Sequence, residues 1–222
     1  MKQGRIIATA HQPVGFRASC LSQPHRGVAG LARLVATDSY HSDLPDDLRQ
    51  SDPMDLAQIA QAHFVDTSLA PAIERHEVLR SSLPEDLVLF FGEMHAGNTR
   101  RNAALKAQLT EIGAEFGAAN VKAVALKGAA ELLAPLWPNA GSRYLSDLDI
   151  LVAEEDLAVA IEVLNDLGAT PEAAEMIDWD VHHHITPYVR DDWSAQVELH
   201  KQVGGRQIGR LLTAEDVFAT AI

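Results

Sequence analysis

The segment that most constrains the fold is SDLDILV, residues 146–152, in which polar and apolar side chains alternate before a fully apolar end. Side chains on a strand alternate between its two faces, so Asp147 and Asp149 point one way and Leu148 and Ile150 point into a core. Magnesium binds one or two carboxylates and fills the rest of its shell with water and phosphate oxygens. The pattern predicts a buried strand with a candidate cation site, and two solvated acids at a strand end are the open alternative.

A second acid lies on a predicted strand further along the chain. In QVELH, residues 196–200, Val197 and Leu199 define a buried face and place Glu198 on the opposite one. If this strand neighbours the first, Asp147, Asp149 and Glu198 can meet and bind two cations. Such a pair activates an attacking oxygen and stabilises a leaving pyrophosphate. An exposed strand acid is the alternative for Glu198.

A strand and a turn precede these acids. The run VKAVALKG, residues 121–128, is a short β-branched stretch that ends in glycine, and a short helix is expected over 129–137. At Lys127 and Gly128 a flexible backbone can approach a phosphate, and Lys127 would add a positive charge. A plain turn with a surface lysine is the alternative. Arg143, in the loop before the acids, could clamp a triphosphate or pair with Asp147.

The middle of the chain has helical spacing. From Met54 onward, apolar residues recur at three- and four-residue steps. They are Leu56, Ile59, Ala60 and Phe64, followed by Leu69, Ala72 and Ile73. A long helix is predicted over 84–117, with an interruption near Gly97 left open and a polar face expected to be charged and solvated.

Three further elements are predicted after the acidic strand. An amphipathic helix over 154–167 should end at Gly168 in a left-handed cap. Strands are expected over 183–189 and 195–200, joined by a turn at 190–192.

The first 37 residues hold five basic side chains and no acidic one. We expect residues 1–53 to be a poorly ordered leader or an overlong translation start, with Met54 as a sensible alternative start. The expected division is therefore 1–53, a helical N-terminal subdomain over 54–118, and a core over 119–222.

Composition excludes several classes of protein. The net charge of -13 argues against a general nucleic-acid binder, which normally presents a basic face. An enzyme that takes one nucleotide with its metal can still be acidic. Cys20 is the only cysteine, so no intrachain disulfide can form. No apolar stretch approaches the roughly 18 residues of a membrane helix, and a cytoplasmic setting is expected.

The run His182, His183 and His184 invites a zinc interpretation. Consecutive strand residues point to alternate faces and cannot all bind one ion, so structural or substrate-positioning roles are favoured for His183, His184 and His200. A zinc hydrolase that uses the run is kept as a minor alternative. Ser142, Ser146 and Cys20 lack a recognisable local signature of a covalent nucleophile.

Taken together, VKAVALKGAAELL, SRYLSDLDILV, HHHITPYV and QVELH resemble the uncharacterised bacterial nucleotidyltransferase family of the DNA-polymerase-beta-like superfamily. The similarity covers about residues 54–203. The residues that match the family pattern are Lys127, Gly128, Arg143, Ser146, Asp147, Asp149, His183, Glu198 and His200.

The resemblance implies an α+β fold in which helices back a small mixed sheet. It implies magnesium or manganese held by Asp147 and Asp149, with Glu198 as third ligand or base. The implied reaction moves a nucleoside monophosphate from an NTP, with ATP the expected donor, to an acceptor hydroxyl. Lys127, Gly128, Arg143 and Ser146 would bind the nucleotide. A small-molecule or protein acceptor is favoured over a nucleic acid.

Two departures from the family pattern support an alternative. The usual glycine-serine signature is Lys127-Gly128-Ala129 here, without a hydroxyl, and the chain ends at Ile222 where family members commonly continue into a helical region. The alternative is a catalytically silent module that binds a nucleotide or a protein, for instance in a toxin-antitoxin or defence pair.

Overall fold

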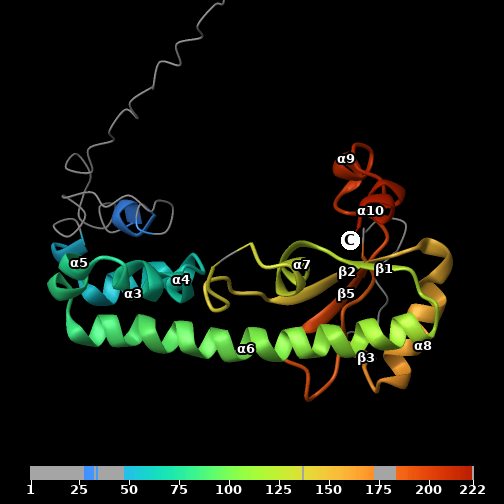
Figure 1. Ribbon diagram of the computed structural model, residues 1–222, viewed down its shortest axis with the longest axis horizontal. Helices are drawn as coiled ribbons and strands as arrows, with labels where there is room; N and C mark the ends of the chain where they lie inside the picture. The colour runs from blue at the N-terminus through green and yellow to red at the C-terminus, as the bar shows by residue number, and fades with distance from the viewer. Residues whose placement is uncertain (1–27, 33, 35–47, 137, 173–183, 222) are drawn as a thin grey trace, which may run out of the picture.

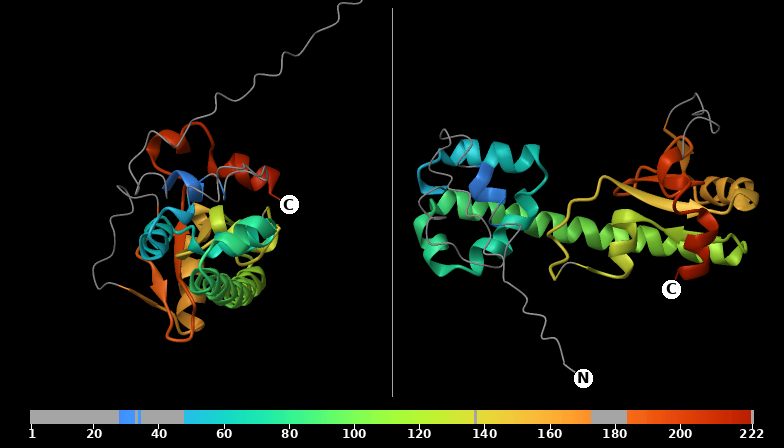
Figure 2. Two further views of the ribbon diagram at one scale, coloured as in Figure 1. Left: turned by 90° about the vertical axis from the view of Figure 1, so that its left-hand side faces the viewer. Right: turned by 90° about the horizontal axis from the view of Figure 1, so that it is seen from above.

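A computed structural model of the chain describes residues 28–32, 34, 48–136, 138–172 and 184–221. Its organising element is α6 (Glu85–Ala118), a helix of 34 residues that runs the length of the molecule. Short helices pack along one half of α6, and a sheet with further helices lies along the other half (Figures 1 and 2). The helix therefore joins two separately packed ends.

At the helical end, α3 (Pro53–Ala62), α4 (Asp66–Glu74) and α5 (Glu77–Ser82) follow the predicted helical spacing. Asp52 caps α3 by accepting a hydrogen bond from the Met54 amide at 2.8 Å. One apolar cluster fills this end. It comprises Leu31, Leu34, Leu48, Leu56, Ala60, Leu69, Ala70, Ala72, Ile73, Leu79, Leu83, Leu87 and Phe91.

Of the predicted apolar stripe, Ile59 is half-buried and packs against this cluster, whereas Phe64 lies outside it. The helix α3 ends at Ala62, and Phe64 takes a left-handed backbone with φ 55° and is 66% exposed. Placing Phe64 on the buried face was therefore wrong, because the chain turns before that position. The proposed leader falls mostly in residues 1–27 and 35–47, which lie outside the described residues. The domain boundaries stay predictions.

The long helix is continuous. Gly97 lies inside α6 with no break, so the interruption left open at this position does not occur. The helix ends at Ala118, and Asn120 takes a left-handed φ of 56° while the Val121 amide donates to the Phe116 carbonyl at 2.8 Å. This backbone pattern satisfies carbonyls that the last turn would otherwise leave unpaired.

The sheet has five strands in the order β1-β2-β5-β4-β3. Their bounds are β1 (Ala123–Ala125), β2 (Asp147–Val152), β3 (Thr170–Pro171), β4 (Tyr188–Val189) and β5 (Gln196–His200). The central pair, β2 and β5, is parallel, and the other three pairs are antiparallel. A mixed sheet backed by helices confirms the predicted α+β class.

Two details of the sheet differ from the expectation. The two-residue β3 was not predicted, and the strand expected over 183–189 is, within the described residues, a bridge from His184 to His200 followed by β4. The turn after β4 is present at 191–192.

The apolar core of this end lies on one face of the sheet. Leu148 and Ile150 of β2 and Val197 and Leu199 of β5 pack in a cluster with the second half of α6 and with α8 (Leu157–Asp166). The predicted helix over 154–167 is a short 3-10 turn, η2 (Glu154–Asp156), followed by α8, and Gly168 has the expected left-handed φ of 82°. The opposite face of β2 and β5 carries the polar residues of these strands together with the buried Leu151.

Three short helices complete the fold. Between β1 and β2 lies α7 (Lys127–Leu133), which ends before the predicted limit at residue 137, a residue outside those described. After β5 come α9 (Arg206–Gly209) and α10 (Ala214–Thr220), on the side of the sheet away from α6 (Figure 1). The Lys122 Nζ atom lies 4.7 Å from the Phe218 ring, which joins α10 to the start of β1. Within the described residues, no helix has the length and apolarity needed to cross a membrane.

Candidate metal centre

The parallel pairing of β2 and β5 builds an acidic cluster on the polar face of the sheet. The register places Asp149 beside Glu198 and Leu151 beside His200. Asp149, Glu198 and His200 each offer one ligand atom, and these atoms lie within 4.8 Å of one another. Asp147 precedes this group on the same strand face, pairs in register with Gln196 and is half-buried. The predicted pairing of the two strands is confirmed. His200, which was predicted only to position a substrate, also belongs to the cluster.

Asp149 is the centre of the cluster. Its Oδ1 atom lies 2.7 Å from the Lys127 Nζ and 2.7 Å from the His200 Nε2. The Asp149 side chain is 4% exposed and that of His200 is 0% exposed. The Glu198 Oε2 lies 3.5 Å from the His200 Nε2 and 4.0 Å from the His184 Nδ1. Lys127 and His200 therefore both contact the buried carboxylate of Asp149, and His200 also lies near the half-buried carboxylate of Glu198.

These contacts set the charge states of the cluster. Burial would raise the pKa of Asp149, but hydrogen bonds from His200 and Lys127 outweigh it and lower that pKa. The pKa of Glu198 is lowered chiefly by its hydrogen bond with His200. Burial opposes the charged form of His200, and the two carboxylates outweigh it and raise that pKa. Both central carboxylates are thus held ionised.

The pKa of Asp147 shifts in the opposite direction from that of Asp149. Burial raises its pKa, and the negative charges of Asp149 and Glu198 raise it further. The Ser146 side chain and the charge of Lys127 oppose this shift without cancelling it. An excess of negative charge at Asp147 is the condition that a bound cation would relieve.

The backbone aims Lys127 at the cluster. The Leu126 amide at the end of β1 donates to the Asp149 carbonyl at 2.9 Å. Lys127 then takes a left-handed φ of 47°, which costs a side-chain-bearing residue about 1–2 kcal/mol. The bond from its Nζ atom to Asp149 offsets part of this cost. The turn predicted at Lys127 and Gly128 is instead the start of α7, which follows β1 after Leu126 alone, and the lysine contacts a carboxylate.

Gly128 has a packing reason of its own. A Cβ atom at this position would lie 2.1 Å from the Leu145 Cδ2. A side chain at this position would therefore have to displace the Leu145 side chain, whether or not a phosphate also approaches it.

Arg143 does not pair with Asp147, so that interpretation was wrong. Its guanidinium forms an ion pair with Glu131 of α7. The loop runs along α7 before it reaches β2, which brings Glu131 rather than Asp147 within reach. Ser146 is exposed and bonds to the neighbouring Asp147.

The loop before β2 is held by side chains that the sequence analysis missed. The Asn98 Nδ2 of α6 donates to the carbonyls of Gly141 and Arg143, both at 2.8 Å. The Asn102 Nδ2 donates to the carbonyls of Ala140 at 2.7 Å and Arg143 at 2.9 Å. Both asparagines are 5% exposed. The signal in the sequence was two asparagines four residues apart in a gap of the apolar stripe.

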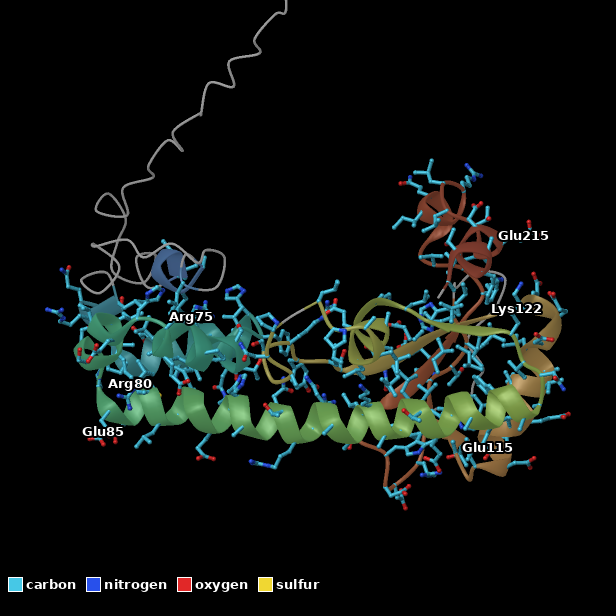
Figure 3. The ribbon with its side chains drawn as sticks, viewed as in Figure 1. Arg75, Arg80, Glu85, Glu115, Lys122 and Glu215 are labelled. Atoms are coloured by element: carbon cyan, nitrogen blue, oxygen red, sulfur yellow. The ribbon has the colours of Figure 1, made fainter. Side chains whose placement is uncertain are left out.

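Gln108 of α6 likewise holds the backbone just before β5 by hydrogen bonds. Its Nε2 donates to the Ala195 carbonyl at 2.8 Å, and its Oε1 accepts from the Ser194 amide at 3.2 Å. The expectation that the polar face of α6 is solvated was therefore wrong for this stretch, because the face is buried against polar backbone. The expectation holds elsewhere on α6: Glu85 and Glu115 are exposed, and Glu85 points away from the short helices that pack on α6 (Figure 3).

The histidine run is only partly described. His182 and His183 lie outside the described residues. The ring centroid of His184 lies 5.4 Å from that of His200, beside the acidic cluster. Of the three histidines proposed to position a substrate, the structure brings His184 and His200 together.

The donor set of this cluster fits a divalent cation. Two ionised carboxylates and one imidazole on rigid strands are a suitable ligand set for manganese. Magnesium instead takes carboxylate oxygens and water. Chemically, the arrangement can hold a cation beside a lysine that offers positive charge to an anionic ligand.

Comparison with known families gives the class of the protein. Residues 49–220 match a family model described as uncharacterised nucleotidyltransferase. Because the match covers most of the chain, the chain belongs to this nucleotidyltransferase family, and its class is that of a transferase. No curated protein and no solved structure shows significant similarity to the chain.

Proposed function

We propose that the protein transfers a nucleoside monophosphate from an NTP, with ATP the expected donor, to an acceptor hydroxyl, assisted by a divalent cation. The observation that carries the proposal is the meeting of Asp149, Glu198 and His200 at one point of the sheet. Membership of the nucleotidyltransferase family supports the reaction class. The sequence motifs further support a place in the DNA-polymerase-beta-like superfamily.

Asp149 and Glu198 are the shared ligands in this proposal, and the third ligand depends on the ion. Magnesium takes oxygen ligands, so with magnesium we expect Asp147 to complete the set and His200 to hold Asp149 in place. Manganese also accepts a neutral imidazole, so His200 can ligate it once its proton has been displaced. When bound, the cation would neutralise charge on the phosphates and the departing pyrophosphate.

The reaction forms a bond from the acceptor oxygen to the α-phosphorus and breaks the bond from that phosphorus to the pyrophosphate oxygen. Glu198 accepts the hydroxyl proton, which its lowered pKa allows because the carboxylate is ionised at neutral pH. Lys127 adds positive charge beside the phosphates. Arg143 can do so only after it leaves Glu131. Roles for Gly128, Ser146 and His183 stay predictions.

The net charge of -13 favours a small-molecule or protein acceptor over a nucleic acid. We also propose a cytoplasmic setting, since the single cysteine gives no sign of an oxidising compartment.

The direct test is incubation with α-labelled or γ-labelled ATP, with magnesium or manganese, alone and with panels of hydroxyl-bearing small molecules and proteins. We expect transfer of the α label only, with release of pyrophosphate. Asp149→Asn should lower the rate by about 10³-fold or more, since it removes a central ligand. Asp191→Asn, a change at an exposed turn acid, is the matched control.

Absence of transfer together with absence of nucleotide binding would overturn the proposal. Nucleotide binding without transfer under every condition would instead indicate the catalytically silent module.

A further inference from the structure

Two aromatic side chains stack on each other where the turn between α3 and α4 meets the loop that precedes β2. The centroids of the Phe64 and Tyr144 rings lie 5.5 Å apart, with 15° between the ring planes. Phe64 is 66% exposed and Tyr144 is 39% exposed. The stack therefore leaves most of the Phe64 surface open to a further flat group.

The backbone holds Phe64 in a position that glycine usually occupies. The Val65 amide donates to the Ala60 carbonyl at 2.9 Å, in the pattern that ends a helix with a left-handed residue. Phe64 is that residue, with φ 55°, a conformation that is unfavourable for any residue with a side chain. Its ring lies outside the apolar cluster of the helical end. Core packing therefore does not account for a strained aromatic residue here, whereas strain of this kind is common at ligand sites.

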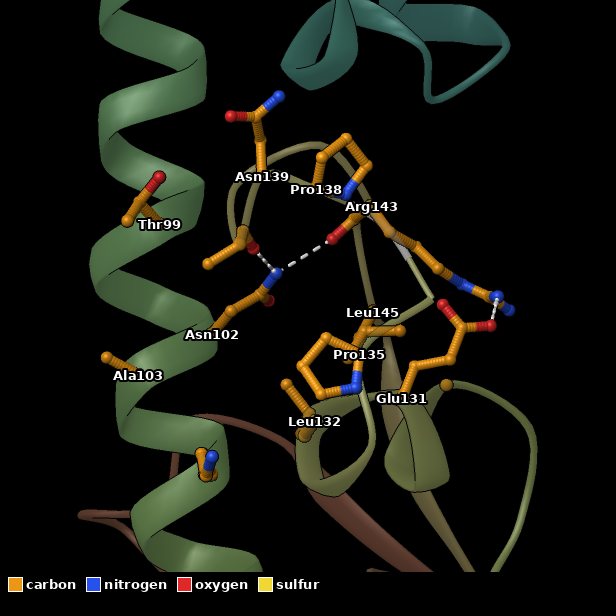
Figure 4. A pocket seen from close by; sticks show the side chains of 13 residues that line it. Thr99, Asn102, Ala103, Glu131, Leu132, Pro135, Pro138, Asn139, Arg143 and Leu145 are labelled. Carbon is orange, nitrogen blue, oxygen red and sulfur yellow. Dashed lines mark hydrogen bonds and ion pairs between the residues drawn. The ribbon is translucent and has the colours of Figure 1, made fainter.

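The Tyr144 side of the stack is held in place by α6. The Arg101 guanidinium lies 4.8 Å from the centroid of the Tyr144 ring and also donates to the Leu145 carbonyl. Asn102 donates to the Arg143 carbonyl, immediately before Tyr144, as Figure 4 shows. A ring that is already fixed loses little entropy when a ligand stacks on it.

The stack is close to the proposed metal centre along the chain. Tyr144 precedes Asp147 by three residues, and three residues of extended chain span at most about 11 Å. The sugar and phosphates of a nucleotide can bridge a distance of this size. A nucleotide with its α-phosphate at the metal centre can therefore place its base near the two rings.

The chemistry of the stack favours a nucleobase. An exposed aromatic ring binds planar ring systems through their faces, whatever their hydrogen-bonding groups. The net charge of -13 disfavours a nucleic-acid strand, so a single nucleotide is the expected occupant. On the basis of the nucleotidyl transfer proposed above, we propose that the base of the donor nucleotide stacks on Phe64, whose ring Tyr144 supports.

Calorimetry on the full chain with magnesium, using ATP or inorganic tripolyphosphate, separates base binding from phosphate binding. Phe64→Leu removes the ring, and Phe64→Gly also removes the backbone strain. Both should weaken ATP binding by roughly tenfold and leave tripolyphosphate binding unchanged. Phe64→Trp keeps a stacking ring and should bind ATP at least as tightly as the wild type. The control Leu89→Ala, at an α6 side chain that is 59% exposed, should change neither affinity.

Three results would overturn this inference while the proposed transfer stands, because ATP would still bind the wild type. The first is ATP binding by Phe64→Leu and Phe64→Gly as tight as that of the wild type. The second is an equal loss of tripolyphosphate binding, which would show that Phe64 acts through the fold. The third is a loss of ATP binding by Phe64→Trp as large as that of Phe64→Gly. Absence of ATP binding by the wild type would instead overturn both proposals.

Discussion

Successive parts of α6 bury different kinds of side chain. In its first half, Leu87 and Phe91 enter the purely apolar cluster of the helical end. In its middle, Asn98 and Asn102 are as deeply buried, yet they bind backbone carbonyls of the loop that leads to Asp147. Beyond them, Leu105 and Leu109 return to an apolar core under the sheet.

This difference indicates that the apolar part of α6 mainly stabilises the fold and that the polar part mainly positions a loop. Apolar burial is non-directional and tolerates small shifts of the packed groups, whereas hydrogen bonds fix an atom's place and direction. The helical end should therefore contribute mainly free energy of folding. The polar middle should contribute mainly the geometry of the loop before β2, which is also held from the helical end by the bond from the Thr67 hydroxyl to the Ser142 carbonyl at 3.2 Å.

The largest effect on stability is expected from Phe91→Ala. Phe91 is 1% exposed in the apolar cluster, so truncation should lower the free energy of unfolding by about 3–5 kcal/mol. At a temperature where the variant stays folded, nucleotide binding should be close to that of the wild type. Urea unfolding and calorimetry with ATP measure the two quantities. A loss of nucleotide binding as large, in free energy, as the loss of stability would contradict the proposed separation of the two roles.

Asn102→Ala should have a smaller effect on stability and a larger one on the site. It removes two hydrogen bonds to loop carbonyls and should cost about 1–3 kcal/mol. Because one of those carbonyls belongs to Arg143, nucleotide binding should fall as well. Thr110→Ala, at an exposed position of the same helix, should change stability by less than about 0.5 kcal/mol. If Asn102→Ala destabilises the fold without altering nucleotide binding, the positioning role is wrong.

The smallest effect is expected at the end of α6. Asn120 holds a left-handed φ of 56°, a conformation that alanine adopts at a cost of about 1 kcal/mol and glycine adopts freely. Asn120→Ala should be less stable than the wild type by about that amount, and Asn120→Gly should not. Thermal unfolding of the two variants makes the comparison. Equal stability of the two would show that the backbone here relaxes.

The sequence predicted those features that local patterns encode. Alternation in SDLDILV and QVELH identified the two central strands and the face that carries Asp149 and Glu198, and helical spacing identified α6. An interruption was left open at Gly97, and the polar residues that follow it were expected to be solvated, because periodicity counts only apolar partners. The true partners of these polar residues are backbone carbonyls about 40 residues away in the chain, as in the bond from Asn102 to Arg143.

Other features depended on tertiary packing in the same way. The ion pair of Arg143 with Glu131 requires the loop to run beside α7. The position of His200 in the cluster requires the parallel register of β2 with β5, which no local pattern specifies. The two-residue β3 is too short to carry any periodic signal.

The central claim is that Asp149 and Glu198 hold a divalent cation, and manganese binding followed by electron paramagnetic resonance tests it most directly. The wild type and the control Asp191→Asn should bind manganese with the same affinity in the presence of ATP. Asp149→Asn should bind it at least tenfold more weakly, and the weaker binder of Asp147→Asn and His200→Gln identifies the third ligand. Equal manganese binding by the wild type and Asp149→Asn would contradict the account.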